Sequence, residues 1–224
     1  MTNKKILLGL TTTRNSNWLD KVREIEEFQI SEAALFLTGI NKENREKLYS
    51  LLEKTPLKSA PHIHLRNDMK KDEVKYLIDR YGTTLLNIHS KEEFDFDPEE
   101  LKSFRDKIYI ENTHTVPTQK ELDNYAGLCL DFTHWEVFRK KENYRELKDL
   151  AQKNKIGCCH ISAVKSFFGF FGDDSHWADK EKDLDYILKY VDYLPEIMSL
   201  ELENSFKEQV KFKKYIERIL NINN

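Results

Sequence analysis

Side chains that can bind metal ions recur where apolar segments of this sequence end. The segment 156–159 is short and apolar, and His160 follows it directly. The next loop contains Asp174 and His176 in a D-x-H motif. An imidazole at the end of a predicted strand, with a carboxylate and a second imidazole in the following loop, is a typical set of metal ligands. A single histidine in this position is more often a hydrogen-bonded structural residue, so the hypothesis depends on the rest of the chain.

The same pattern is repeated along the chain. All seven histidines lie at or just after the end of a predicted strand, and none lies on a predicted helix face. Carboxylates and imidazoles that converge in a buried site need partners, because unpaired buried charge is costly. A divalent ion would be such a partner, and the mixture of nitrogen and oxygen donors favours zinc, manganese or iron over magnesium or calcium. The candidate residues are His62, His64, His89, Glu111, His114, Asp131, His134, His160, Asp174, His176, Glu201 and Glu203.

The elements that must position these residues alternate regularly. Apolar strand-like runs and charged helical runs follow one another about every 25 residues, which is typical of βα units in a parallel sheet. The predicted strands are 6–12, 33–37, 60–65, 84–89, 108–112, 128–132, 156–159 and 197–202. The predicted helices are 18–28, one capped by Asn41, 72–81, 98–106, 120–125, 142–154, 183–191 and 206–220.

Eight strands and about eight helices in alternation predict a single (β/α)₈ barrel over residues 1–224. An open doubly wound sheet is the alternative, but it requires a glycine-rich phosphate-binding turn after the first strand. The segment 11–18, TTTRNSNW, contains no glycine. In a (β/α)₈ barrel the carboxyl ends of all strands meet at one rim, where active sites form. The barrel would therefore bring the candidate ligands together.

Composition limits the classes of function. The chain has 224 residues, of which 39% are hydrophobic and 33% charged, with a formal net charge of −3. This charge argues against a large basic surface for nucleic acid. No segment approaches the ~20 apolar residues of a membrane span or forms a signal peptide. The three cysteines lie in predicted strands and are expected to be reduced, which makes the cytoplasm the expected location.

On these motifs the chain resembles the xylose-isomerase-like TIM-barrel superfamily, which contains the endonuclease IV family and many sugar isomerases and epimerases. Ile110 to Thr113, IENT, is similar to the LENT of endonuclease IV. The segment 160–166, HISAVKS, is similar to its HLNDAKS. Leu200–Glu201 is similar to its LET, which favours Glu201 over Glu203 as a ligand.

The resemblance implies a set of metal ligands. Glu111 would bridge two zinc ions, and His89 with one of His62 and His64, here taken as His64, would complete the first. The other ligands would be Asp131, His160 and Glu201 for the second ion, and His134, Asp174 and His176 for a third. Two or three Zn²⁺ ions imply metal-assisted hydrolysis of a phosphoester, with Glu111 and Glu201 as the catalytic carboxylates. The substrate would be a phosphorylated or sugar-like small molecule, or damaged DNA.

The alternative is a sugar or sugar-phosphate isomerase or epimerase. One Mn²⁺ or Mg²⁺ ion would be held by Glu111, Asp131, His160 and Glu201, and the two glutamates would move a proton between carbon atoms. A third class is a metal-binding barrel without enzymatic activity. The side chains expected to contact the substrate are His62, His114, Phe168, Phe171 and Glu203. The phenylalanines are either a hydrophobic plug over the barrel or a lid that stacks on a base or sugar ring.

Overall fold

The first strand is interrupted at Leu8, and this break closes the sheet into a barrel. The computed structural model describes residues 4–13, 15–142, 144–167 and 171–222. β1 (Lys5–Leu7) pairs with β11 (Ile197–Leu200), whereas β2 (Gly9–Thr11) pairs with β3 (Ala34–Phe36). The parallel sheet has the order β1-β11-β8-β7-β6-β5-β4-β3-β2. It therefore begins and ends on the two halves of one strand, which confirms the predicted (β/α)₈ barrel.

The remaining strands confirm the predicted positions and place their last residues side by side. Glu111 lies in register with His89, and Asp131 with His160. Because the strands are parallel, these side chains emerge at one rim. The strands are β4 (His62–His64), β5 (Leu85–His89), β6 (Ile108–Glu111), β7 (Gly127–Asp131) and β8 (Ile156–Ile161).

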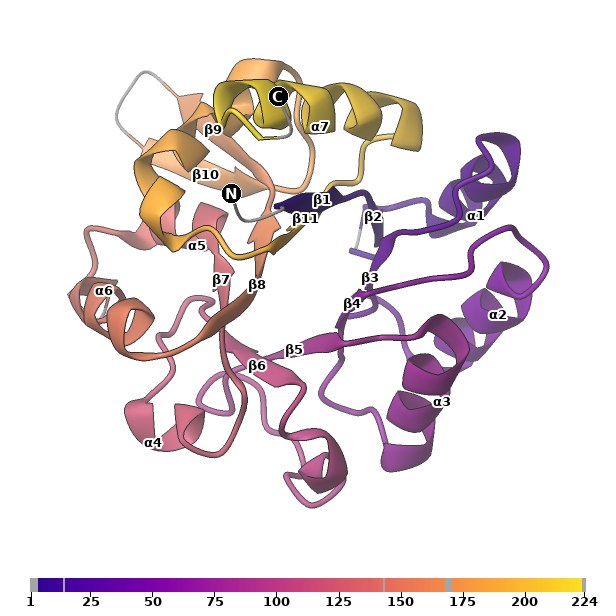
Figure 1. Ribbon diagram of the computed structural model, residues 1–224, viewed down its shortest axis with the longest axis horizontal. Coiled ribbons are helices and arrows are strands. Elements are labelled where there is room, and N and C mark those ends of the chain that lie inside the picture. The colour runs from indigo at the N-terminus through magenta and orange to yellow at the C-terminus, as the bar shows by residue number, and fades with distance from the viewer. Residues whose placement is uncertain (1–3, 14, 143, 168–170, 223–224) are drawn as a thin grey trace.

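Helices surround the sheet and pack their apolar faces against it (Figure 1). Asn41 caps its helix as predicted, because its side chain accepts a hydrogen bond from the backbone of Asn44. No helix among the described residues is long and apolar enough to cross a membrane. The α-helices at predicted positions are α1 (Trp18–Glu27), α2 (Lys42–Leu52), α3 (Lys71–Tyr81), α4 (Gln119–Leu122), α6 (Tyr144–Lys153) and α7 (Phe206–Ile219).

One helix prediction is wrong, and a second is confirmed as a helix of another type. The helix predicted at 98–106 is wrong, since this segment contains only the short 3-10 helix η1 (Lys102–Phe104) between turns. Two inward-facing apolar residues in nine do not make an amphipathic stripe long enough for a stable α-helix. The helix predicted at 183–191 is instead a longer 3-10 segment, η2 (Glu181–Tyr193), which is kinked at Tyr190.

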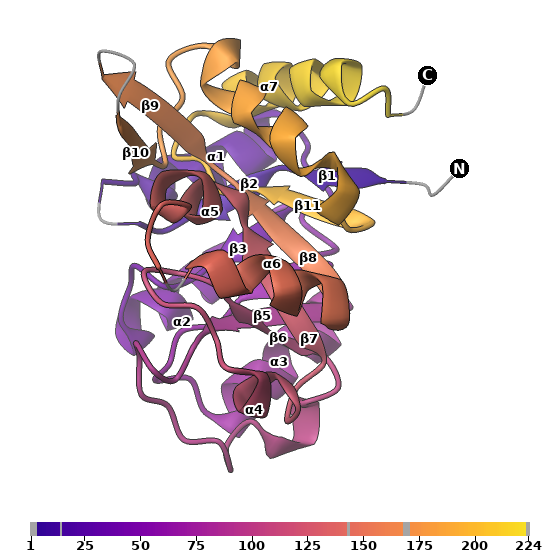
Figure 2. The same cartoon turned by 90° about the vertical axis from the view of Figure 1, so that its left-hand side faces the viewer.

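Two elements near the rim were not predicted. α5 (Phe132–Phe138) begins directly after β7, where Asp131 caps it. The loop expected after β8 instead contains an antiparallel hairpin, β9 (Ala163–Phe167) and β10 (Phe171–Ser175). Figure 2 shows this hairpin at the end of the barrel opposite the start of β1, above the rim where the candidate ligands lie.

A glutamine side chain from α7 bridges the seam of the barrel. Gln209 is fully buried, and its Oε1 accepts from the backbone N–H of Gly9 at 2.7 Å. Its Nε2 donates to the carbonyl oxygens of Gly9, Leu202 and Asn204 at 2.9, 3.0 and 3.0 Å. These backbone groups have no ladder partner where β2 and the chain after β11 separate, so Gln209 satisfies them instead.

We expect Gln209→Met, which keeps the volume and removes the amide, to lower the free energy of unfolding by about 3 kcal/mol. The reason is that several buried backbone groups would lose their partners, at roughly 1–3 kcal/mol each. Urea unfolding measures the change. Gln119→Met is the control: Gln119 is exposed and bonds only the side chains of Asp123 and Asn154. Its loss should stay within about 0.5 kcal/mol, and equal losses in the two variants would contradict the role given to Gln209.

Candidate functional site

Four buried side chains from neighbouring strands converge at the rim. Glu111 and Asp131 end β6 and β7, His160 lies near the end of β8, and Glu201 directly follows β11. None of the four is more than 4% exposed. The Nδ1 atom of His160 lies 3.2 Å from a carboxylate oxygen of Glu201, 3.4 Å from Glu111 and 3.9 Å from Asp131. The fold therefore brings one imidazole nitrogen close to three carboxylates.

Several of these atoms are buried without a hydrogen-bond partner. They include both ring nitrogens of His160 and the Oδ2 atom of Asp131. An unsatisfied buried polar atom costs roughly 1–3 kcal/mol, and a divalent ion would satisfy these atoms together. One atom each of Asp131, His160 and Glu201 lie within 4.8 Å of one another, which suits ligands of one ion. One nitrogen with three carboxylates fits manganese, magnesium or zinc.

A second group of ligands surrounds the other side of Glu111. The Nε2 atom of His64 lies 3.3 Å from Oε2 of Glu111, and neither ring nitrogen of His64 has a hydrogen-bond partner. The Nε2 atom of His89 lies 3.9 Å from Oε1 of Glu111. Burial lowers the pKa of His64 to about 3, so its ring is neutral and able to bind metal. One ligand atom each of His64, Glu111 and His160 lie within 4.8 Å of one another and could hold a second ion, whereas no such group among the described residues includes His89.

The residues expected to hold a third ion already have other partners. His134, on α5, lies 2.9 Å from a carboxylate oxygen of Asp174 through Nε2 and 3.1 Å from the carbonyl oxygen of Asn112 through Nδ1. His176 donates from Nδ1 to the carbonyl oxygen of Glu201 at 3.1 Å. Among the described residues, His134, Asp174 and His176 do not form a group whose ligand atoms all lie within 4.8 Å of one another.

Buried charges shift the pKa values of the site in opposite directions. Burial alone would lower the pKa of His160, but Glu111 and Glu201 raise it well above the usual value. Burial would raise the pKa of Glu201, but His160 and His176 lower it to about 2. Burial raises the pKa of Asp131 to about 6. Without a bound ion, a protonated His160 therefore balances part of the carboxylate charge.

A cavity of about 180 Å³ opens above these residues, and only some of the predicted side chains line it. Of the four converging residues, Glu111 and Glu201 reach the cavity, whereas Asp131 and His160 do not. Its other lining residues are Thr13, Thr38, His89, Glu93, Phe94, Thr113, His114, His134 and His176.

The residues expected to contact the substrate are distributed differently. His114 lines the cavity. Glu203 does not line it, and its carboxylate accepts a hydrogen bond from Thr13. His62 is 1% exposed and lies inside the barrel beneath the cavity. Phe168 is outside the described residues, as is the side chain of Phe171.

Several residues in or beside the cavity were missed in the sequence, namely Thr13, Thr38, Thr113, Glu93, Phe94 and Asn87. Phe94 is 41% exposed, and its ring lies 4.8 Å from that of His89, between centroids. Glu93 accepts a hydrogen bond from Thr113. Both follow a strand end within five residues, which is the signal that could have identified them. Asn87 donates to Oε2 of Glu111 at 2.6 Å; it lies two residues before His89 and therefore on the same face of β5.

Comparison with known proteins yields structural matches only. No protein-family model matches the sequence. No curated protein matches it either.

Three solved structures of very different sequence are similar to this chain. A D-tagatose 3-epimerase-like protein is 14% identical, with 96% of this chain and 97% of that chain covered and a TM-score of 0.51. A 3-keto-D-glucoside 4-epimerase from E. coli is 12% identical, with 97% and 99% covered and a TM-score of 0.45. An uncharacterized protein from Parabacteroides distasonis is 12% identical, with 95% and 98% covered and a TM-score of 0.49. At this identity the first match supports the same barrel fold.

The raised pKa of His160 predicts how stability depends on pH. A histidine whose pKa is higher in the folded state stabilises the fold fully below its unfolded pKa of about 6.5, and this contribution is lost as the pH rises through the folded pKa. In chelator-treated protein we expect the melting temperature to fall as the pH is raised from 6.5 to 9. His64 acts weakly in the opposite sense just above pH 6.5, where its unfolded form still loses protons, and it is neutral in both states from about pH 8 upward.

Zn²⁺ should oppose this loss, because an ion binds the deprotonated imidazole and binds more tightly at higher pH. Scanning calorimetry with and without Zn²⁺ measures both effects. His160→Asn is the control and should show a smaller fall with pH than the parent chain. An equal fall in the two proteins would exclude His160 as its source.

Proposed function

We propose that this chain is a divalent-metal-dependent isomerase or epimerase that acts on a sugar or a sugar-like molecule. One observation carries the proposal. Of the four side chains that converge at the rim, Asp131 and His160 are covered, whereas Glu111 and Glu201 also line the cavity. Two carboxylates can therefore reach a substrate that lies over a metal ion.

Glu111, Asp131, His160 and Glu201 would hold the ion. When bound, such an ion polarises a carbonyl group and its neighbouring hydroxyl, which makes the adjacent C–H bond more acidic. The fit is supported by the unpartnered atoms of His160 and Asp131 and by the close approach of their ligand atoms.

The two glutamates would perform the proton transfer. They lie on β6 and directly after β11, with β7 and β8 between them in the sheet, so they approach the cavity from different sides. In an epimerase, one carboxylate removes the proton next to the carbonyl, and the other, in its protonated form, returns a proton on the opposite face. In an isomerase the proton is returned to the former carbonyl carbon, and the hydroxyl proton of the carbon that lost its hydrogen moves to the former carbonyl oxygen. One proton is removed and one is returned in each case.

The cavity supports a small substrate. Its volume of about 180 Å³ is below the roughly 300–1,000 Å³ that is usual for drug-sized ligands. Imidazole and hydroxyl groups line it beside the aromatic ring of Phe94, which suits a molecule with several hydroxyl groups and an apolar face. The similar D-tagatose 3-epimerase-like protein carries a name of the same functional class. The small cavity and the net charge of −3 do not support a duplex DNA substrate.

Phosphoester hydrolysis at a zinc centre with several ions is the second candidate. It is favoured by His64, whose ring nitrogens are both unpartnered beside Glu111, and by the endonuclease IV-like motifs at 110–113 and 160–166. The hydrogen-bonded pair of His134 and Asp174 argues against a third ion.

Proton exchange with solvent tests the isomerase or epimerase. In D₂O with Mn²⁺, we expect the parent chain to exchange the hydrogen next to the carbonyl of at least one sugar in a panel of ketohexoses and ketopentoses, followed by NMR. Glu111→Gln and Glu201→Gln should each slow exchange by about 10²–10⁴-fold, because each removes an acid–base group. Glu203→Gln, outside the cavity, should change the rate only a few-fold. Cleavage of a phosphoester without any C–H exchange would contradict the proposal.

Metal stoichiometry separates the two candidates. The double variant Asp174→Ala/His176→Ala should keep the same number of ions per chain as the parent, because the four main ligands are intact. Elemental analysis of protein purified without chelator measures this number. Asp131→Asn is the positive control and should lose an ion. Loss of one ion from the double variant would favour the hydrolase with three zinc ions.

A further inference from the structure

A chain of hydrogen bonds runs beneath the cavity and ends on Glu111. Ser199 Oγ lies 2.7 Å from Nδ1 of His62, and Nε2 of His62 lies 3.0 Å from Oδ1 of Asn87. The amide nitrogen of Asn87 lies 2.6 Å from Oε2 of Glu111. The four side chains come from β11, β4, β5 and β6, and each is at most 1% exposed. Water therefore does not compete for these bonds.

The direction of each bond is fixed by the carboxylate. The carboxylate oxygen Oε2 of Glu111 accepts the short bond to the amide of Asn87. Asn87 must therefore donate through its NH₂ group, which turns its oxygen towards His62. His62 must then carry a proton on Nε2, and when the ring is neutral its Nδ1 accepts from the hydroxyl of Ser199. All three bonds point towards Glu111.

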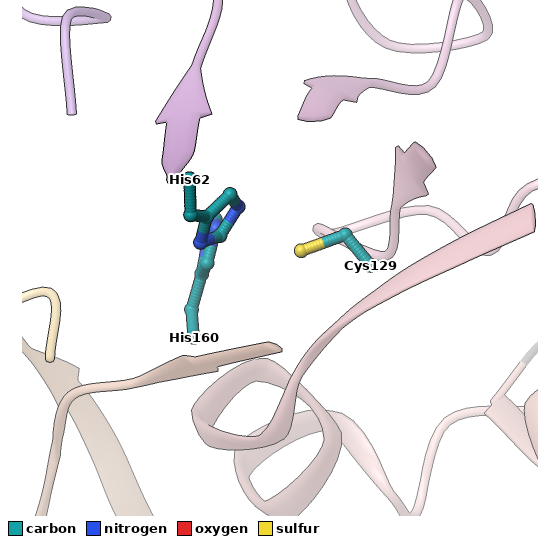
Figure 3. Close-up of side chains that lie close together, drawn as sticks. All are labelled: His62, Cys129 and His160. Carbon is teal, nitrogen blue, oxygen red and sulfur yellow. The ribbon is translucent and has the colours of Figure 1, made fainter. Parts of the chain in front are cut away.

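His62 has no ring nitrogen free for an ion. Figure 3 shows its ring close to that of His160, with the sulfur of Cys129 directed towards the pair, and the ring centroids are 5.3 Å apart. His62, Cys129 and His160 are close enough to be considered as ligands of a metal ion. Both nitrogens of His62 are already used in the hydrogen-bond chain, however. This points to a supporting role for His62 rather than to a second metal centre inside the barrel.

The chain gives the two oxygens of Glu111 different surroundings. Oε2 is held by Asn87 and also lies 3.3 Å from His64. Oε1 faces Nδ1 of His160 at 3.4 Å and Nε2 of His89 at 3.9 Å. We propose that Asn87, oriented by His62 and Ser199, is a positioning residue: it anchors Oε2 of Glu111 and thereby fixes the carboxylate that would hold the ion and take part in the proton transfer. The proton transfer rests on the proposed isomerase or epimerase activity.

His62 and Glu111 together would hold the Asn87 amide in one orientation, each bonding one end of it. If the amide turned over, its oxygen would face the oxygen of Glu111, and the two would repel each other. The Nε2–H group of His62 prevents this because it needs an acceptor on its own side of the amide. Hydrogen-bonded partners of a ligating carboxylate typically change metal affinity or activity by roughly 10–100-fold when they are removed.

The first test is the protonation state of His62 in the metal-free parent chain. With ¹⁵N-labelled histidine, NMR should show a neutral ring protonated on Nε2, with the signal assigned through its absence in His62→Gln. A ring protonated on Nδ1, or on both nitrogens, would overturn the proposal.

The second test is Mn²⁺ affinity, measured by competition with a chelator. Asn87→Leu should weaken it by about 10–100-fold and should lower kcat for C–H exchange more than it raises KM. His62→Leu should lose part of the same affinity, and His62→Gln, which keeps a donor near the position of Nε2, should restore it. Unchanged affinity in Asn87→Leu, or equal affinities in the two His62 variants, would overturn the proposal. Weakened affinity with no sugar exchange even in the parent would instead overturn only the proposed function.

Discussion

Burying three carboxylates around one imidazole is the constraint on which this structure depends. Each ionised group removed from water costs several kcal/mol unless it is paired. A protonated His160 offsets only part of this charge, and its raised pKa reflects that role. A divalent ion would offset more of it and would release the proton. The barrel can hold such a site because its strands end at one rim. The four ligands lie at or directly beside these strand ends, so no flexible loop positions them.

Two of the carboxylates meet this constraint in the same way. Oδ1 of Asp131 accepts from the backbone N–H of His134 at 2.8 Å and thereby caps α5, while Oδ2 is left without a partner. Glu111 is likewise anchored through Oε2 by Asn87. In each residue one oxygen fixes the side chain and the other faces the converging ligands. The abrupt start of α5 after β7 is therefore part of the site, since the cap orients Asp131.

The sequence predicts the strands and their rim residues well, because strand length, apolar runs and strand ends are local properties. It predicts poorly how far below the rim of the barrel each side chain lies. His62 and His64 lie two residues apart and share a face, but a rise of about 3.3 Å per residue puts one at the ligands and the other beneath them. The role of Asn87 could not be predicted from the sequence either, because it depends on side chains of the neighbouring strands. The positions of Glu93 and Phe94 depend on the path of a loop, which the hydrophobic periodicity of the sequence does not predict.

The number of ions depends on how completely each group of ligands is already satisfied. His134 and Asp174 pair with each other, so a third ion would have to break an existing hydrogen bond. His64 is open, because both of its ring nitrogens lack partners. A second ion beside His64 would use Oε2 of Glu111, which would then have to serve both that ion and the N–H group of Asn87. The hydrogen bond from Asn87 therefore favours the site with one ion, which is the site that the proposed isomerase or epimerase requires.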